Sequence, residues 1–185
     1  MVFDRMNRIA RIVWRDWNRI NHVNPVKRMN PVIIQGGCHA DDRGALRFCN
    51  DFDMSAVKRF YTIANSAEQP VRGWIGHRRE TKWFFPIKGV TIVEVEPMTD
   101  NHEETWRGED GVDSRVDNST CSARSPRSRY LLDVSDPAVL KVPPENWFCI
   151  KQDGNAEVMV FSDCRVGEFD DDFRRPVVKE VFGQD

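Results

Sequence analysis

The chain lacks several features that would assign it quickly to a common class. None of its apolar runs approaches the roughly 20 residues that a helix needs to cross a bilayer, and no secretory signal core precedes the cysteines. The five cysteines, an odd number, include no C-x-x-C pair, which favours free thiols in a reducing cytoplasm. The motifs G-x-x-x-x-G-K-[ST], G-x-G-x-x-G and G-x-S-x-G do not occur, so the usual phosphate-binding loops and the nucleophile elbow are excluded.

Charge is distributed unevenly along a chain that is close to neutral overall. The 185 residues carry a formal net charge of −2, yet residues 1–28 hold seven Lys or Arg against two Asp. The remainder is therefore mildly acidic and offers no bulk electrostatic attraction to nucleic acid. A hydrophobic content of 40% over this length suits one globular domain with a real core.

Residues 1–28 have the pattern of a basic amphipathic helix. Ile9, Val13, Trp17 and Ile20 recur at helical spacing, and arginines are interleaved between them. Such a helix could lie on an anionic membrane surface, or it could be an accessory helix or an upstream extension of the domain. We therefore expect a helical extension over residues 1–28 and a single domain over residues 29–185.

From Pro31 onward the pattern changes to short runs of β-forming residues separated by turn residues. The expected strands are 32–34, 45–48, 57–64, 83–87, 90–95, 130–134, 138–142, 147–150 and 157–161. Many short strands at close spacing are typical of an antiparallel sandwich or barrel rather than a βαβ fold. Residues 99–129, rich in Asp, Glu, Asn, Ser and Arg, are expected to form a long polar loop, either a lid over a pocket or a tolerated insertion.

The stretch from residue 71 to residue 84 combines basic side chains with the best-placed histidine of the chain. It sets Arg72, His77 and Lys82 between runs with strand character, which is typical of the floor of an anion-binding pocket. Alternation along an extended segment would put Ile75 and His77 on one face, opposite Arg72 and Trp74. An isolated histidine on a strand is more often a hydrogen-bonded structural residue than a base, so both interpretations of His77 stay open at this point.

Four short pieces of sequence occur in a recognisable order. They are Asp42 to Leu46 (DRGAL), Val57 to Tyr61 (VKRFY), Arg72 to His77 (RGWIGH) and Val142 to Trp147 (VPPENW). Together they resemble the cupin-fold nucleotide-sugar enzymes, nearest the dTDP-6-deoxyhexose 3,4-ketoisomerases and related WxcM-like proteins, and more distantly the dTDP-4-dehydrorhamnose 3,5-epimerases. The resemblance covers residues 31–175. It implies an all-β cupin domain, a jelly-roll β-barrel, behind the N-terminal helical extension, and it implies a homodimer.

The resemblance also implies roles for individual residues. Arg43, in the family's D-x-R-G-x-L piece, and Arg72 would contact the nucleotide diphosphate, a task that suits the planar fork of donors on arginine. His77 would be the base that moves protons at carbons beside a ketone. Tyr61 would be the partner acid, and Lys82 would donate to the ketone oxygen. The remaining expected substrate contacts are Arg59 and Trp147.

The chain departs from the family at two positions. Ile75 stands where relatives carry a first histidine, and Phe148 stands where they carry another histidine after the tryptophan. These replacements remove ligands for the metal that many cupins hold, so neither a metal nor another cofactor is expected. An apolar Ile75 would instead favour neutral imidazole at His77, which is the form able to accept a proton.

The sequence thus predicts an isomerase or epimerase that acts on a nucleotide-linked 4-keto-6-deoxyhexose. It would be of the 3,4-ketoisomerase type, use His-based proton transfer and serve surface polysaccharide biosynthesis. The expected partners are the dTDP-linked hexose and a second copy of the chain, with no nucleic acid, no membrane span and a cytoplasmic location. The alternative is a non-catalytic cupin module that binds a sugar or nucleotide-sugar, which the loss of two histidines would favour.

Overall fold

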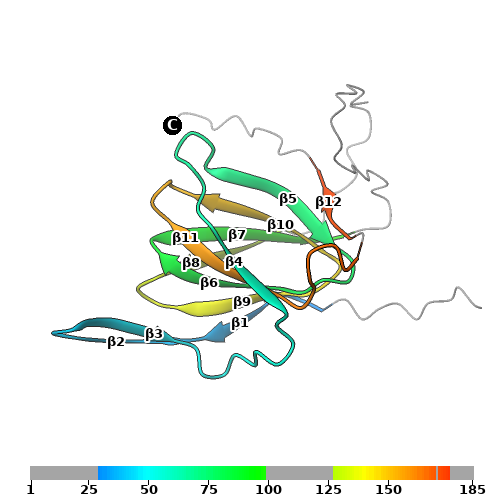
Figure 1. Cartoon of the computed structure of the whole chain (residues 1–185). Helices are drawn as coiled ribbons and strands as arrows, with labels where there is room; N and C mark the ends of the chain where they lie inside the picture. The colour runs from blue at the N-terminus through cyan, green and yellow to red at the C-terminus, as the bar shows by residue number, and fades with distance from the viewer. Residues whose placement is uncertain (1–28, 99–126, 170, 176–185) are drawn as a thin grey trace, which may run out of the picture.

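The computed structural model describes residues 29–98, 127–169 and 171–175, and in this part of the chain the regular elements are all β-strands (Figure 1). The expected N-terminal helix falls on residues 1–28, which lie outside the described residues. The strands are β1 (Val32–Gln35), β2 (Gly37–Asp41), β3 (Gly44–Phe48), β4 (Arg59–Ile63), β5 (Val71–His77), β6 (Lys82–Lys88), β7 (Val90–Pro97), β8 (Ser128–Asp133), β9 (Ala138–Val142), β10 (Asn146–Gln152), β11 (Glu157–Ser162) and β12 (Phe173–Arg174).

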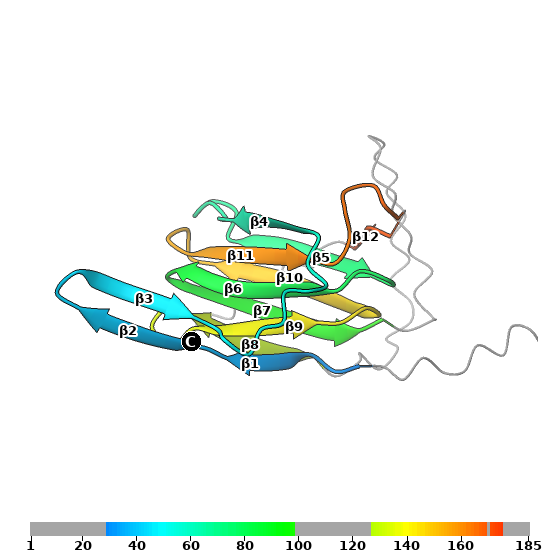
Figure 2. The same cartoon turned by 60° about the horizontal axis from the view of Figure 1, so that its bottom comes forward.

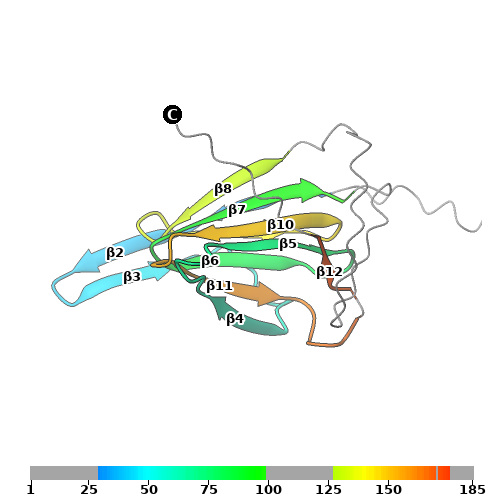
Figure 3. The same cartoon turned by 90° about the horizontal axis from the view of Figure 1, so that it is seen from above.

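The strands form two five-stranded antiparallel sheets and one separate hairpin. The first sheet has the order β1-β9-β6-β11-β4, and the second has the order β12-β5-β10-β7-β8. The sheets lie face to face (Figures 2 and 3). No ladder of hydrogen bonds joins them among the described strands. The prediction of an all-β fold is confirmed. Within the described residues, the two sheets of the expected jelly-roll barrel do not close into a continuous ladder, because side-chain packing holds them together.

Apolar side chains from both sheets meet in the space between them. Burying each large aliphatic or aromatic side chain in such a core contributes about 1.5–3 kcal/mol. The fully enclosed core residues are Ile63, Phe84, Leu140, Val142, Val158 and Val160 from the first sheet, and Val93, Val95, Leu132, Phe148 and Ile150 from the second.

The central strands β6 and β10 are also covered on their outer faces. Trp83 of β6 packs with Phe161 beneath the segment that links β3 to β4. On the other sheet, Trp74 and Trp147 form a cluster with Cys149. Burial on both faces explains why the sequences of β6 and β10 are nearly continuous apolar runs rather than alternating apolar and polar residues.

Each expected strand corresponds to an observed one, with ends that differ by at most two residues, and β5 covers the stretch that was treated as an extended segment. The strands β2 and β12 were not expected. The segment 37–41 contains no apolar run, and it becomes a strand by pairing with β3 in a hairpin that projects beyond the sheets (Figures 1 and 2). The strand β8 begins at Ser128, so the end of the expected polar loop is strand, while residues 99–126 lie outside the described residues. No helix in the described part of the chain is long and apolar enough to cross a membrane.

Candidate active site

A cavity of about 380 Å³ lies between the two sheets. Strands β4, β5, β6, β10 and β12 supply its walls, together with described residues between β11 and β12, in the ranges 164–169 and 171–172. Most of the residues expected from the sequence to carry function line it: Arg59, Tyr61, Arg72, His77 and Lys82.

A β-bulge in β5 decides which of its side chains reach the cavity. In the ladder with β10, Ile75 pairs with Phe148, but Arg72 pairs with Ile150, so β5 has one residue more than β10 between these pairs. Because of this bulge, Arg72 lines the cavity together with Ile75 and His77. Simple alternation had put Arg72 on the opposite face, which is wrong. Gly73 lies in the bulged stretch, a position where glycine commonly marks such an irregularity.

His77 is buried at the cavity wall, with 6% of its surface exposed. Its Nδ1 lies 2.8 Å from the main-chain oxygen of Asp171 and 3.3 Å from Oε2 of Glu80. Since a carbonyl oxygen can only accept, Nδ1 carries the hydrogen, and Nε2 is left with the free lone pair. Burial lowers the pKa of His77 below its ordinary value of 6.5, partly opposed by the negative charge of Glu80. The shift is in the direction expected beside an apolar Ile75, and the neutral form is the one able to accept a proton.

Glu80 is the centre of a buried polar network beside His77. Its Oε1 accepts hydrogen bonds from Lys82 Nζ, from Ser162 Oγ and, at 2.9 Å, from Arg59 Nη2. Burial alone would raise the pKa of Glu80, but the hydrogen bonds from Lys82 and Ser162, with the positive charge of Lys82, bring that pKa below 4.5. Glu80 is therefore a carboxylate at neutral pH, and it stabilises a positive charge on His77.

Tyr61, on β4, lies beside this network in the wall of the cavity. The centre of its ring is 5.3 Å from the guanidinium carbon of Arg59 and 5.5 Å from Lys82 Nζ, distances at which a cation is attracted to an aromatic face. Arg59 is held by a further hydrogen bond of 2.8 Å from Nε to the main-chain oxygen of Cys164. Arg72 donates to Asn65 Oδ1 at 3.4 Å and is otherwise exposed. The cavity thus combines one imidazole, one phenol and several cations.

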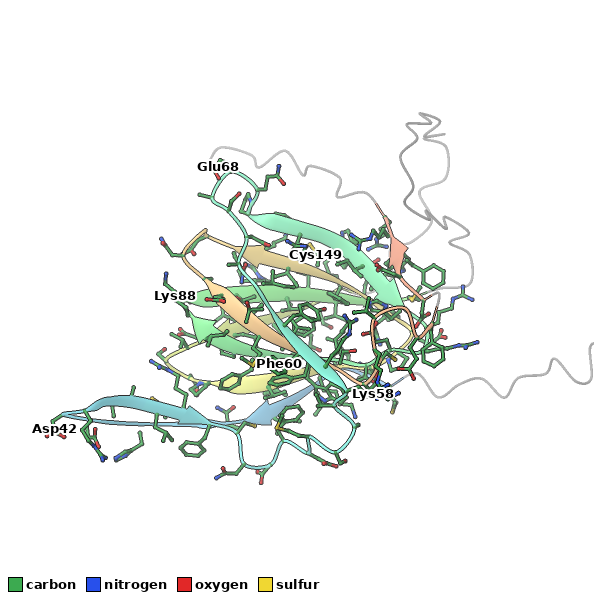
Figure 4. The ribbon with its side chains drawn as sticks, in the orientation of Figure 1. Asp42, Lys58, Phe60, Glu68, Lys88 and Cys149 are labelled. Atoms are coloured by element: carbon green, nitrogen blue, oxygen red, sulfur yellow. The ribbon has the colours of Figure 1, made fainter. Side chains whose placement is uncertain are left out.

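Two residues expected to contact a substrate do not line this cavity. Arg43 lies in the turn of the β2–β3 hairpin, where its side chain is 84% exposed and pairs with Asp41. Figure 4 shows the neighbouring Asp42 at the outer end of this hairpin, well separated from Lys58 at the start of β4. Trp147 points the other way from Phe148 and packs with Trp74 on the outer face of β10.

The donor set of the cavity does not suit a metal ion. Beside His77, the positions at which relatives carry histidines present the hydrocarbon side chains of Ile75 and Phe148. The rings of His77 and Phe148 lie 5.9 Å apart, so Phe148 occupies the space next to the imidazole. Among the described residues, no group of three or more His, Cys, Asp or Glu side chains is arranged to hold a metal. A single imidazole and a carboxylate that is already committed to three donors do not make a site.

Sequence reasoning missed three residues that shape the site. They are Glu80, Ser162 and Asp171, none of which was among the expected site residues. Ser162 and Asp171 are 85 and 94 positions from His77 in the chain, and no local pattern links residues that only the sheet pairing brings together. Glu80, three residues after His77, was the one signal in the sequence, because a carboxylate next to a buried base is a common way to orient it.

Comparison with solved structures finds similar folds among sugar-nucleotide enzymes. The dTDP sugar isomerase from Desulfovibrio desulfuricans matches with a TM-score of 0.58 at 15% identity, covering 80% of this chain and 84% of that chain. A double mutant of the QdtA 3,4-ketoisomerase from Thermoanaerobacterium thermosaccharolyticum, in complex with TDP, matches with a TM-score of 0.53 at 16% identity, with coverage of 80% and 89%. The rmlC epimerase from Mycobacterium tuberculosis matches with a TM-score of 0.52 at 16% identity, with coverage of 76% and 66%.

A scan against protein-family models finds no match, and a search of the curated proteins finds no significant match. The likeness to the solved structures, at these identities, is a likeness of fold. The resemblance inferred from four pieces of sequence is thus confirmed at that level: the chain has the two-sheet fold found in dTDP-sugar 3,4-ketoisomerases and in a related epimerase.

Proposed function

We propose that this chain is an isomerase or epimerase acting on a nucleotide-linked 4-keto-6-deoxyhexose, of the 3,4-ketoisomerase type. One observation carries the proposal. His77 is buried in the wall of a cavity of about 380 Å³, its Nδ1 is occupied by Asp171 and Glu80, and its pKa is lowered by burial. These properties make His77 a base that is neutral at physiological pH and that has one nitrogen available for a substrate proton.

The reaction follows from the position of the base. Nε2 of His77 takes the proton from C3 of the sugar, beside the C4 ketone, and the C–H electron pair forms a C3–C4 double bond while the ketone oxygen becomes an enolate. Protonation of that oxygen by Tyr61 gives an enediol and leaves a tyrosinate. In the second half, the C3 hydroxyl returns a proton to Tyr61, a C3 ketone forms and C4 takes a proton from the imidazolium. The network around Glu80 favours the step, because its negative charge stabilises the imidazolium between the two transfers.

The other polar groups that line the cavity would serve the oxygen atoms of the sugar. Tyr61 is the partner acid, and Lys82 with Arg59 supplies positive charge near the developing enolate. Arg72, exposed at the cavity and tied only by a long hydrogen bond to Asn65, is free to turn towards an anionic group, and we assign it to the diphosphate.

Arg43 would contribute only if the chain forms a homodimer. Its hairpin projects from the sheets, and the neighbouring surface carries exposed apolar side chains, namely Val32, Ile33 and Leu46. Such a surface is consistent with coverage by a second copy. We therefore retain the homodimer, and with it a contact between Arg43 and nucleotide, as part of the proposal. Sedimentation equilibrium of the full chain tests it, and a monomer at micromolar concentration would remove Arg43 from the site.

Solvent exchange tests the central claim. The protein is incubated with dTDP-4-keto-6-deoxyglucose in heavy water, and the sugar is examined by NMR and mass spectrometry for deuterium on the ring and for a 3-keto product. We expect incorporation by the parent protein and none by His77→Asn, with ligand binding within a few-fold of the parent. A His77→Asn variant that exchanges at the parent rate would refute the assignment of the base.

A non-catalytic binding module is the second candidate. It is favoured by the apolar wall that Ile75 and Phe148 form beside His77, where relatives carry histidines. The same experiment separates the two functions, because a module of this kind gives a thermal shift with TDP-sugar and no deuterium in the sugar.

A further inference from the structure

Asp171 makes two different kinds of contact with the region of His77. Its carboxylate accepts hydrogen bonds from three successive backbone N–H groups in the β5–β6 turn: Arg78 at 2.9 Å, Arg79 at 2.7 Å and Glu80 at 3.1 Å. Its main-chain oxygen accepts the hydrogen bond from His77 Nδ1 at 2.8 Å. One residue therefore fixes both the turn that follows the base and the proton on the base.

The hydrogen bonds to the Asp171 carboxylate are stronger than ordinary hydrogen bonds in a turn. Asp171 is 7% exposed, and successive N–H groups that converge on one anion form a nest in which each hydrogen bond is charge-assisted. Ordinary turns in this chain use a single aspartate for a single amide, as Asp53 does for the amide of Ser55 at 2.8 Å. Asp171 instead binds three amides that lie 91 to 93 positions away in the chain, which is more than the turn needs in order to close.

The two contacts are coupled through the geometry of a single residue. The Asp171 carbonyl belongs to the segment between β11 and β12, and the carboxylate on the same residue ties that segment to the turn after β5. If the carboxylate is removed, the carbonyl is no longer held against Nδ1. Nδ1 of His77 then keeps only the longer contact with Glu80 Oε2, at 3.3 Å, so its preference for the Nδ1–H tautomer is weakened rather than abolished.

We propose that Asp171 is the positioning residue for His77: by clamping the 78–80 turn it holds its own carbonyl at Nδ1 and keeps the imidazole in the Nδ1–H tautomer. The catalytic meaning of this inference rests on the proposed role of His77 as the base. The positioning itself is a property of the free protein and can be measured without substrate.

Several charged groups face His77 and contribute to its titration. Glu80 in the β5–β6 turn and Asp172 in the segment before β12 favour the charged imidazole, while Lys82 on β6 disfavours it. Arg59 on β4 reaches the same region through its hydrogen bond to Glu80. These charges act on the pKa of His77. The tautomer of the neutral imidazole depends instead on which ring nitrogen has a nearby acceptor, so a change in tautomer reports on the clamp rather than on the net charge of the cavity.

The test is ¹⁵N NMR of the imidazole nitrogens in the full chain. The chain has four histidines, and the spectrum of His77→Asn assigns the signals of His77. At a pH where the imidazole is neutral, we expect the parent to show a protonated Nδ1 and an unprotonated Nε2. Asp171→Ala should show a mixture of tautomers, Asp171→Asn an intermediate spectrum because one acceptor oxygen remains, and Asp133→Ala the parent spectrum. Asp133 is a matched control, since it caps the amide of Ser135 at 2.8 Å in the β8–β9 turn.

Exchange of substrate deuterium gives the second measurement. Asp171→Ala should exchange on the order of 10- to 100-fold more slowly than the parent, as is usual when a residue that orients a reactive imidazole is lost, with a smaller change in affinity for TDP. If Asp171→Ala does not fold, Asp171→Asn and its thermal midpoint take its place. A parent-like tautomer in these variants overturns the inference. A parent protein that shows the Nδ1–H tautomer but gives neither exchange nor a 3-keto product overturns the proposed function instead and leaves the positioning intact.

Discussion

The buried network around Glu80 allows a quantitative prediction about stability. Glu80→Ala would leave Lys82, whose side chain is 4% exposed, without the carboxylate that accepts its hydrogen bond. Removing one partner of a buried ion pair costs about 3–5 kcal/mol, because the remaining charge is desolvated and uncompensated. For a chain of this size 1 kcal/mol shifts the thermal midpoint by about 2–4 °C, so the expected fall is about 6–20 °C.

A double-mutant cycle isolates the pair from the rest of the network. Lys82→Met removes the charge but keeps a long apolar side chain, so Glu80→Ala combined with Lys82→Met should be more stable than the sum of the two single changes implies. Coupling energies for residues in direct contact are about 0.5–3 kcal/mol. Thermal and urea unfolding of the four proteins gives the coupling. If the two changes in unfolding free energy are additive, or if Glu80→Ala lowers the unfolding free energy by less than about 1 kcal/mol, the buried pair does not stabilise the fold.

The contribution of the Glu80–Lys82 pair to folding stability should depend on pH in a defined way. The folded-state pKa of Glu80 is lowered from 4.5, so folding is favoured by the ionised carboxylate above that value. This contribution is lost as the pH falls through the lowered folded pKa. The difference in stability between the parent and Glu80→Gln should therefore be constant at neutral pH and shrink in acid, below about pH 4.5.

Three further predictions concern the base, its strand and the thiols. Because burial lowers the pKa of His77 from 6.5, the exchange rate should rise with pH with a midpoint below 6.5, and a midpoint above it would contradict the desolvated environment. A side chain at Gly76 would bring its Cβ to 2.7 Å from the Trp147 ring, so Gly76→Ala should lower stability by about 1–3 kcal/mol in urea unfolding, unless that ring moves at no cost. Burial raises the pKa of Cys149 to about 11, so peptide mapping after native thiol alkylation at pH 8 should find Cys38 labelled and Cys149 unlabelled; early labelling of Cys149 would contradict its burial.

The positions of the strands could be predicted from the sequence because each is marked by its own residues. β9, for example, is apolar over Ala138–Val142 except for Lys141 and was predicted with these bounds. β2 could not be found in this way, because its side chains are largely exposed and only the pairing with β3 makes it a strand. β12 is two residues long and exists through its contacts with β5. Local pattern identifies elements that carry a core, whereas it cannot identify elements that exist through their partners.

The choice between the two faces of a strand was the weaker part of the prediction. Trp147 and Phe148 are adjacent, apolar and both buried, since β10 is covered on both sides. Nothing in their chemistry tells which one faces the cavity, and only the register with β5, in which Phe148 pairs with Ile75 and Trp147 with Gly76, decides it. Arg72 illustrates the same point, because one extra residue in β5 reverses the face that its side chain occupies.

The arrangement of charges constrains how Lys82 can take part in catalysis. Lys82 Nζ already donates to Glu80 and lies 5.5 Å from the centre of the Tyr61 ring. To stabilise an enolate it must share its hydrogens between Glu80 and the substrate oxygen, which an ammonium with three donors can do without leaving its partner. Because Glu80 already holds Lys82 in place, Lys82 would lose little side-chain entropy when the substrate binds. In a desolvated cavity, a fixed positive charge would stabilise the enolate more than a mobile one. Glu80 thus contacts both the imidazole of His77 and the ammonium of Lys82, so one carboxylate would stabilise the imidazolium and fix the cation for the enolate.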